Sequence, residues 1–230
     1  RRRSDGARVV IKATSEEGGV RELEHARRCR RVLEEINFAY QTFFSPKEVL
    51  FERVGGYTIS IQEFIEQDKP FLSRPLTEQF ALALTAFKAQ ESAHATTYGH
   101  LRLVRRNFGT MSAQDYAQTF RSFADNILKR QSDDVRLSDL LHRAAEFIEK
   151  NVETTERYCG FLTHVDFVPH NFRIKGGAIY LLDHSSLRFG NKYEGWARFL
   201  NFMALYNPPL EEALTRYVRD NRTPEESLAL

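Results

Sequence analysis

The sequence is poor in the features that mark several classes of protein. Two of its 230 residues are cysteines, Cys29 and Cys159, and their wide separation excludes a disulfide framework or a cysteine metal cluster. No apolar run approaches the roughly 20 residues that cross a bilayer. The formal net charge of +2 gives no strong field for a nucleic-acid partner. These absences predict a globular protein of a reducing, cytoplasmic compartment, with neither a membrane nor a nucleic-acid partner.

The residue pattern predicts two parts within the chain. With 42% hydrophobic and 28% charged residues, the chain is large enough for one big domain or two smaller lobes. Strand-like runs and one helix, at 19–37, precede residue 66, and a hairpin is predicted at 49–66. Amphipathic helices are predicted afterwards, among them 112–130, 134–159 and 210–220. We therefore predict an α+β protein divided into residues 1–66 and 67–230.

The stretch from Gly160 to Ser186 carries the strongest chemical pattern. His164, Asp166 and Asn171 have the spacing H-x-D-x-x-x-x-N, and a Gly-Gly turn then separates two strand-like runs, the second of which ends at Asp183. A hairpin there lets the side chains of Asn171 and Asp183 lie near each other, with Asp166 in the preceding loop. Two carboxylates and an amide suit a site that orients a hydroxyl and holds Mg²⁺. The plainer interpretation is a loop with an Asx-turn before a hairpin.

This stretch resembles the catalytic core of the protein-kinase-like fold, and most closely the aminoglycoside phosphotransferase and small-molecule kinase family. The resemblance implies a bilobal fold, with a small, mostly antiparallel N-terminal sheet and a larger helical C-terminal lobe. It implies that Asp166 accepts the proton of a substrate hydroxyl and that Asn171 and Asp183 hold Mg²⁺. His164 is expected to support the loop.

The resemblance also implies a site for ATP in the N-terminal part. Lys12 ends an apolar strand that is similar to the V-A-I-K strand of kinases, although alone it would be read as an exposed lysine on an edge strand. The partner of this lysine in the family is a glutamate of the next helix, for which Glu22 and Glu24 are candidates. Glu22 is preferred because it lies beside the apolar stripe. Glu63, through its carbonyl, and Ile65, through its amide, are expected to contact adenine.

The chain departs from the kinase pattern at several positions. Val165 replaces the arginine of H-R-D, and Val168 stands where protein kinases carry a lysine, which favours a small-molecule kinase. No G-x-G-x-x-G loop is present. Because Lys12 is so near the start of the sequence, we expect that loop upstream and the chain to be truncated at both ends. Glu194 occupies a place where the family has an aspartate that supports the catalytic loop.

The predicted function is Mg·ATP-dependent transfer of the γ-phosphoryl group to a hydroxyl of a small molecule, such as an aminoglycoside, a sugar or an amino alcohol. One alternative is a pseudokinase-like binding or scaffold module without turnover, which the missing glycine-rich loop favours. Another is a nucleic-acid binder using Arg1–Arg3 and the arginines of residues 27–31. The low net charge disfavours it, and the arginines are expected to form a solvated helix face.

Overall fold

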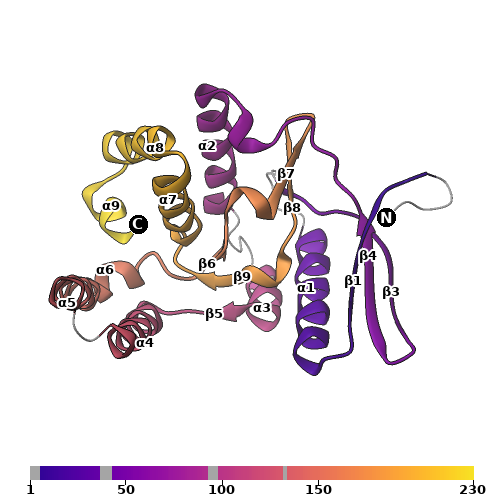
Figure 1. Ribbon diagram of the computed structural model, residues 1–230, viewed down its shortest axis with the longest axis horizontal. Coiled ribbons are helices and arrows are strands. Elements are labelled where there is room, and N and C mark those ends of the chain that lie inside the picture. Colours follow the sequence, from indigo (N-terminus) through magenta and orange to yellow (C-terminus); the bar gives the residue numbers. More distant parts are fainter. Residues whose placement is uncertain (1–5, 37–42, 93–97, 132–133) are drawn as a thin grey trace.

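The computed structural model describes residues 6–36, 43–92, 98–131 and 134–230. Arg1–Arg3, which belong to the nucleic-acid hypothesis, lie outside this part. A small sheet and one long helix form one side of the molecule, a group of helices forms the other, and short strands lie between them (Figure 1). Among the described residues, no helix combines the length and apolar composition that crossing a bilayer requires. The predicted α+β class is confirmed.

The N-terminal sheet is antiparallel with the strand order β1-β4-β3. Its strands are β1 Val9–Thr14, β3 Glu48–Val54 and β4 Tyr57–Glu63. Gly55 and Gly56 form the turn between β3 and β4 with φ of 57° and 83°, a left-handed conformation that glycine adopts without steric cost. Helix α1, Glu17–Ile36, follows β1. The predicted strand, helix and hairpin of this part are therefore confirmed.

A short 3₁₀ turn and a series of helices follow the sheet. They are η1 Phe71–Ser73, α2 Leu76–Ser92, α3 Tyr98–Asn107, α4 Ala113–Arg130, α5 Val135–Lys150 and α6 Val152–Glu156. The prediction of a single helix over 134–159 was wrong, because the helix breaks at Asn151. The Asn151 side chain donates to the carbonyl of Phe147 at 2.7 Å and so competes with continued helical bonding.

Short strands at the centre of the molecule carry the chemically interesting stretch. The elements are β2 Phe43–Phe44, β5 Gly109–Thr110, β6 Phe161–His164, η2 Pro169–Asn171, β7 Phe172–Lys175, β8 Ala178–Leu181, η3 His184–Ser186 and β9 Leu187–Gly190. β7 and β8 form the predicted hairpin, and β6 pairs with β9 in antiparallel fashion. The loop before β7 and the loop after β8 therefore meet at one end of the hairpin. β2 pairs with β8, so the chain before residue 66 also contributes to this central group.

The C-terminal helices are α7 Glu194–Tyr206, α8 Pro208–Asn221 and α9 Pro224–Ala229. The core beneath the central strands is aromatic: Trp196 of α7 stacks on Phe87 of α2 with ring centroids 3.9 Å apart. Phe167 is fully buried and stacks on Phe172 at 5.2 Å. Because such a core is close-packed, it holds the loop that contains Asp166 in a fixed position.

Candidate functional site

Asp166 lies in a loop that is anchored on both sides. The strand β6 ends at His164, and the backbone amide of Val165 donates to the carbonyl of Ser186 at 2.9 Å. Phe167 and Val168, which follow Asp166 directly in the sequence, are both fully buried. The Asp166 side chain remains 38% exposed, so the fold holds its backbone firmly and leaves its carboxylate accessible.

Asn171 and Asp166, both predicted from the sequence, are in direct contact. The amide nitrogen of Asn171 donates at 2.8 Å to Oδ2 of Asp166 and at 2.8 Å to its backbone carbonyl. Because the nitrogen is used in this way, the amide oxygen of Asn171 faces away from Asp166. No hydrogen bond within the described part of the chain occupies that oxygen, so it is available as a metal ligand.

Asp183 follows β8 and is linked to the same loop. The amide of Leu182 donates to the carbonyl of Asn171 at 2.9 Å, which joins the two loops at the backbone. Burial tends to raise the pKa of the Asp183 carboxyl, but hydrogen bonds from the hydroxyls of Ser185 and Ser186, each 2.6 Å long, bring it below its ordinary value. Asp183 is therefore ionised at neutral pH.

His164 connects the two loops, and its imidazole is not placed to carry a proton. Its Nε2 donates to the carbonyl of Asp183 at 2.7 Å, and its side chain is 1% exposed. Burial lowers the pKa of His164, so the imidazole is neutral. This geometry agrees with the predicted supporting role, because a neutral, enclosed ring that binds a backbone carbonyl fixes the loop.

The donors at this place fit a hard cation. They are one ionised carboxylate, of Asp183, and one amide oxygen, of Asn171. Mg²⁺ is typically held by one or two carboxylates together with waters and substrate phosphates, and not by a cage made of protein alone. Accordingly, the described residues contain no cluster of three or more His, Cys, Asp or Glu side chains able to hold a metal.

Lys12 approaches the site from the N-terminal sheet. It lies on β1 opposite Ser60 of β4, and its side chain is exposed. Burial raises the pKa of Asp183, and the serine hydroxyls lower it. The positive charge of Lys12 is a smaller cause that also lowers this pKa. Among the described residues Lys12 forms no ion pair, so its ammonium group is free to bind an anion.

The expected Lys12–Glu22 ion pair is not formed. Glu22 is exposed on α1, and the alternative candidate, Glu24, binds Arg53 of β3 at 2.9 Å. The reason is the orientation of α1, which turns basic side chains toward the sheet: Arg27 and Arg30 both bind the carboxylate of Glu48. The role of Glu22 as a partner of Lys12 therefore has no support in this geometry.

The Glu48 cluster, comprising Glu48, Arg27 and Arg30, was missed by the sequence analysis. Arg27 donates to both oxygens of Glu48 at 2.7–3.0 Å, and Arg30 is only 3% exposed. The prediction that these arginines form a solvated face was wrong for both. The contact joins α1 to Glu48, the first residue of β3, and depends on how the helix is rotated against the N-terminal sheet.

The two residues expected near adenine lie at the end of β4. Glu63 is the last residue of this strand, and Ile65 follows with a side chain that is 5% exposed. The amide of Phe64 donates to the carbonyl of Arg8 at 3.1 Å, whereas the amide of Ile65 has no partner within the described ranges. The amide of Ile65 is therefore available to a ligand, and adenine contact by Glu63 and Ile65 stays a prediction.

Arg198 of α7 is a further site residue that the sequence analysis missed. Its Nε and Nη2 atoms each lie 2.8 Å from Oδ1 of Asp166. The buried Val168 leaves the loop of Asp166 without a cation at the place where protein kinases have one. Arg198 is an exposed residue of a helix that is otherwise largely apolar.

Glu194 does not bind the loop that contains Asp166, so that expectation was wrong. Its carboxylate accepts from the hydroxyl of Tyr116 at 2.6 Å and from Nε of Arg188 at 3.1 Å. Support from α7 comes instead through the next residue, because the amide of Gly195 donates to the hydroxyl of Thr163 at 3.3 Å. The N-terminus of α7 thus holds β6 rather than the loop itself.

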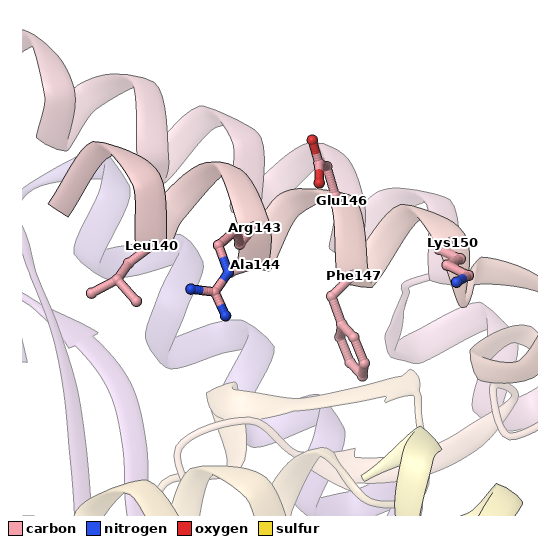
Figure 2. A pocket seen from close by; sticks show the side chains of 6 residues that line it. All are labelled: Leu140, Arg143, Ala144, Glu146, Phe147 and Lys150. Carbon is pink, nitrogen blue, oxygen red and sulfur yellow. The ribbon is translucent and has the colours of Figure 1, made fainter. Parts of the chain in front are cut away.

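A surface pocket on α5 lies apart from these residues. Figure 2 shows its lining, in which Leu140, Arg143 and Phe147 extend to the same side of the helix. The pocket is lined by one helix only, so it is a shallow apolar and basic depression. It contains none of the predicted site residues.

Comparison with known proteins places the fold. No protein-family model and no curated protein matches the chain. Solved structures do match: the GDP complex of aminoglycoside 2'-phosphotransferase-IIIa has a TM-score of 0.69 and 12% identity, over 96% of this chain and 74% of that one. Aminoglycoside phosphotransferase APH(3'')-Id from Streptomyces rimosus gives 0.63 and 13%, over 99% and 85%. ADP-bound APH(2'')-Ib gives 0.60 and 16%, over 96% and 74%.

These matches confirm the predicted fold. The chain has the bilobal, kinase-like fold of the aminoglycoside phosphotransferases. At identities of 12–16%, the similarity establishes the fold alone.

Proposed function

We propose that this chain, which has the fold of aminoglycoside phosphotransferases, transfers the γ-phosphoryl group of Mg·ATP to a hydroxyl group of a small molecule. One observation carries the proposal. The amide nitrogen of Asn171 binds Asp166 at 2.8 Å, which leaves the amide oxygen free in a loop joined at the backbone to the ionised Asp183. A base and two oxygen donors in this order suit phosphoryl transfer.

In the proposed reaction Asp166 acts as the base. Its Oδ2 accepts the hydrogen bond of Asn171 and has one further acceptor position for a substrate hydroxyl. As the proton moves to Asp166, the hydroxyl oxygen forms a bond to the γ-phosphorus and the bond to the β-phosphate oxygen breaks, which releases ADP. The proton on Asp166 then passes to solvent. Positioning and charge stabilisation supply most of the rate.

The other residues hold the nucleotide. Asn171 and Asp183 would bind Mg²⁺, which when present neutralises charge on the phosphates. Lys12 would contact the α- and β-phosphates with its unpaired ammonium group. Glu63 and Ile65 would present backbone groups to adenine. Glu22 is exposed on α1 and has no part in this arrangement.

A binding module without turnover is the alternative that a specific observation favours. Arg198 binds Asp166, so the carboxylate that would receive a substrate hydroxyl is already engaged by a side chain of the same protein. The alternative predicts nucleotide binding without ADP formation. The names of the structural neighbours include kanamycin and streptomycin complexes, but those acceptors are properties of those proteins.

The test is Mg·ATP binding measured by calorimetry on the native chain and on Asp183→Asn. We expect binding that requires Mg²⁺ in the native chain and is lost or weakened at least tenfold in the variant, because one of two metal ligands is removed. The matched control is Asp139→Asn, the same change at an exposed position of α5. Equal Mg²⁺-dependent binding by native chain and Asp183→Asn would exclude Asp183 as a metal ligand.

A further inference from the structure

The side of Asp166 that faces α7 carries a cation with unused hydrogen-bonding capacity. Arg198 spends its Nε and Nη2 atoms on Oδ1 of Asp166 and remains 48% exposed. A guanidinium group has five N–H donors. No other partner of Arg198 occurs among the described residues, so three N–H groups are available to an anion.

The contacts of Asp166 determine where a substrate hydroxyl can bind. Oδ1 receives both contacts from Arg198, and Oδ2 receives one hydrogen bond from Asn171. The free acceptor position is therefore on Oδ2, in the same carboxylate that Arg198 contacts. When the hydroxyl of a molecule binds Oδ2, the unused N–H groups of the Arg198 guanidinium lie close to the rest of that molecule.

Beyond Arg198 lies a row of rings, made of Phe202 and Tyr206 on the same face of α7 and of His170 of η2, which contacts Phe202. We call these three rings the α7 ledge. Phe202 and Tyr206 follow Arg198 at four-residue intervals, so all three share one helix face. Phe202 stacks on Tyr206 with centroids 4.4 Å apart, and His170 meets Phe202 at 5.3 Å. Tyr206 is 63% exposed, so the ledge is open to a ligand.

The α7 ledge lies on the acceptor side of the site. β1, which carries Lys12, and α7 are on opposite sides of the central strands (Figure 1). The nucleotide is expected on the Lys12 side, and this leaves the α7 side for the molecule that receives the phosphoryl group. Within the described chain, Asp166 is the one carboxylate that contacts Arg198, and Arg198 balances its charge.

We propose that the acceptor is a hydroxy acid with a flat apolar body. Its hydroxyl binds Oδ2 of Asp166, its carboxylate binds the free N–H groups of Arg198, and its apolar part packs on the α7 ledge. Arg198 is then the specificity-determining residue, since a guanidinium group binds a carboxylate through paired, charge-assisted hydrogen bonds. This inference rests on the proposed phosphotransfer and names its class of acceptor.

The test compares three acceptors that share a phenyl ring and a benzylic hydroxyl: mandelate, 1-phenyl-1,2-ethanediol and 2-amino-1-phenylethanol. We expect ADP formation from Mg·ATP to show a kcat/KM at least tenfold higher for mandelate than for the neutral diol, and lowest for the amine. Arg198→Gln should abolish the preference for mandelate, and Arg198→Lys should restore part of it. Arg216→Gln, at an exposed position of α8, is the control and should keep the order.

Two results would overturn the inference. One is an equal or better rate with the amine. The other is an equal loss for all three acceptors in Arg198→Gln, which would assign Arg198 to the transferring phosphoryl group. If no ADP forms at all, calorimetric binding of the three compounds decides the inference separately from the proposed function: preferential binding of mandelate, lost in Arg198→Gln, supports it, and absence of preference refutes it.

Discussion

Replacing Glu48 by glutamine is expected to destabilise the protein by about 3 kcal/mol, because it leaves a buried guanidinium group without a counter-charge. Arg30 is 3% exposed and Glu48 20%, so their pair is shielded from water. Arg27 is 27% exposed and should contribute less than about 1 kcal/mol. At this chain length a loss of about 3 kcal/mol lowers Tm by about 6–12 °C.

The assay is urea unfolding of Glu48→Gln, Arg30→Met and the double variant. Arg30→Met should cost only about 1 kcal/mol, because Glu48 keeps Arg27, and the double variant should recover about 2 kcal/mol of the summed losses. Glu52→Gln, the same change at an exposed position of β3, should have little effect. A loss below about 1 kcal/mol in Glu48→Gln, or additive losses in the double variant, would refute the reasoning.

Two further predictions concern the packing around the site. Burial and the nearby charge of Arg30 lower the pKa of His184 from 6.5 to about 3, so the unfolded chain takes up a proton that the folded chain does not. The free energy of unfolding should therefore fall as pH drops from about 6.5 toward 3. Urea unfolding measured across this pH range should show a flatter dependence for His184→Asn, and an unchanged slope in the variant would contradict the role of His184. Gly195→Ala should destabilise by about 1–3 kcal/mol in urea unfolding, because the added Cβ would lie 2.1 Å from Oε1 of the buried Gln90, and full stability would contradict this packing.

The residues of the central hairpin could be predicted because their contacts are local in sequence. Asp166 and Asn171 are five residues apart, and the β7–β8 hairpin carries Asp183 back to them, so spacing and turn chemistry were enough. The strand that carries Lys12 was also visible from its apolar run. In these segments, local preference and tertiary structure agree.

Contacts between distant segments could not be read in the same way. Arg198 meets Asp166 across 32 residues, and Arg30 meets Glu48 across 18, and both depend on how a helix is rotated against its neighbours. The same rotation explains why the Lys12–Glu22 pair was wrongly expected: periodicity identifies the apolar stripe of α1 but not which charged residues beside it face the sheet. The glutamate was chosen by analogy, and the geometry favours arginines at that face.

We propose that the γ-phosphoryl group of Mg·ATP reaches a small-molecule hydroxyl at the loop of Asp166 and Asp183. The most direct measurement is ³¹P NMR of Mg·ATP with mandelate and with the neutral diol. We expect a phosphomonoester signal to grow together with ADP. Asp183→Asn should slow its growth on the order of a thousandfold, whereas Asp139→Asn should not. Saturated Mg·ATP binding without any phosphomonoester, or equal rates in the native chain and Asp183→Asn, would contradict it.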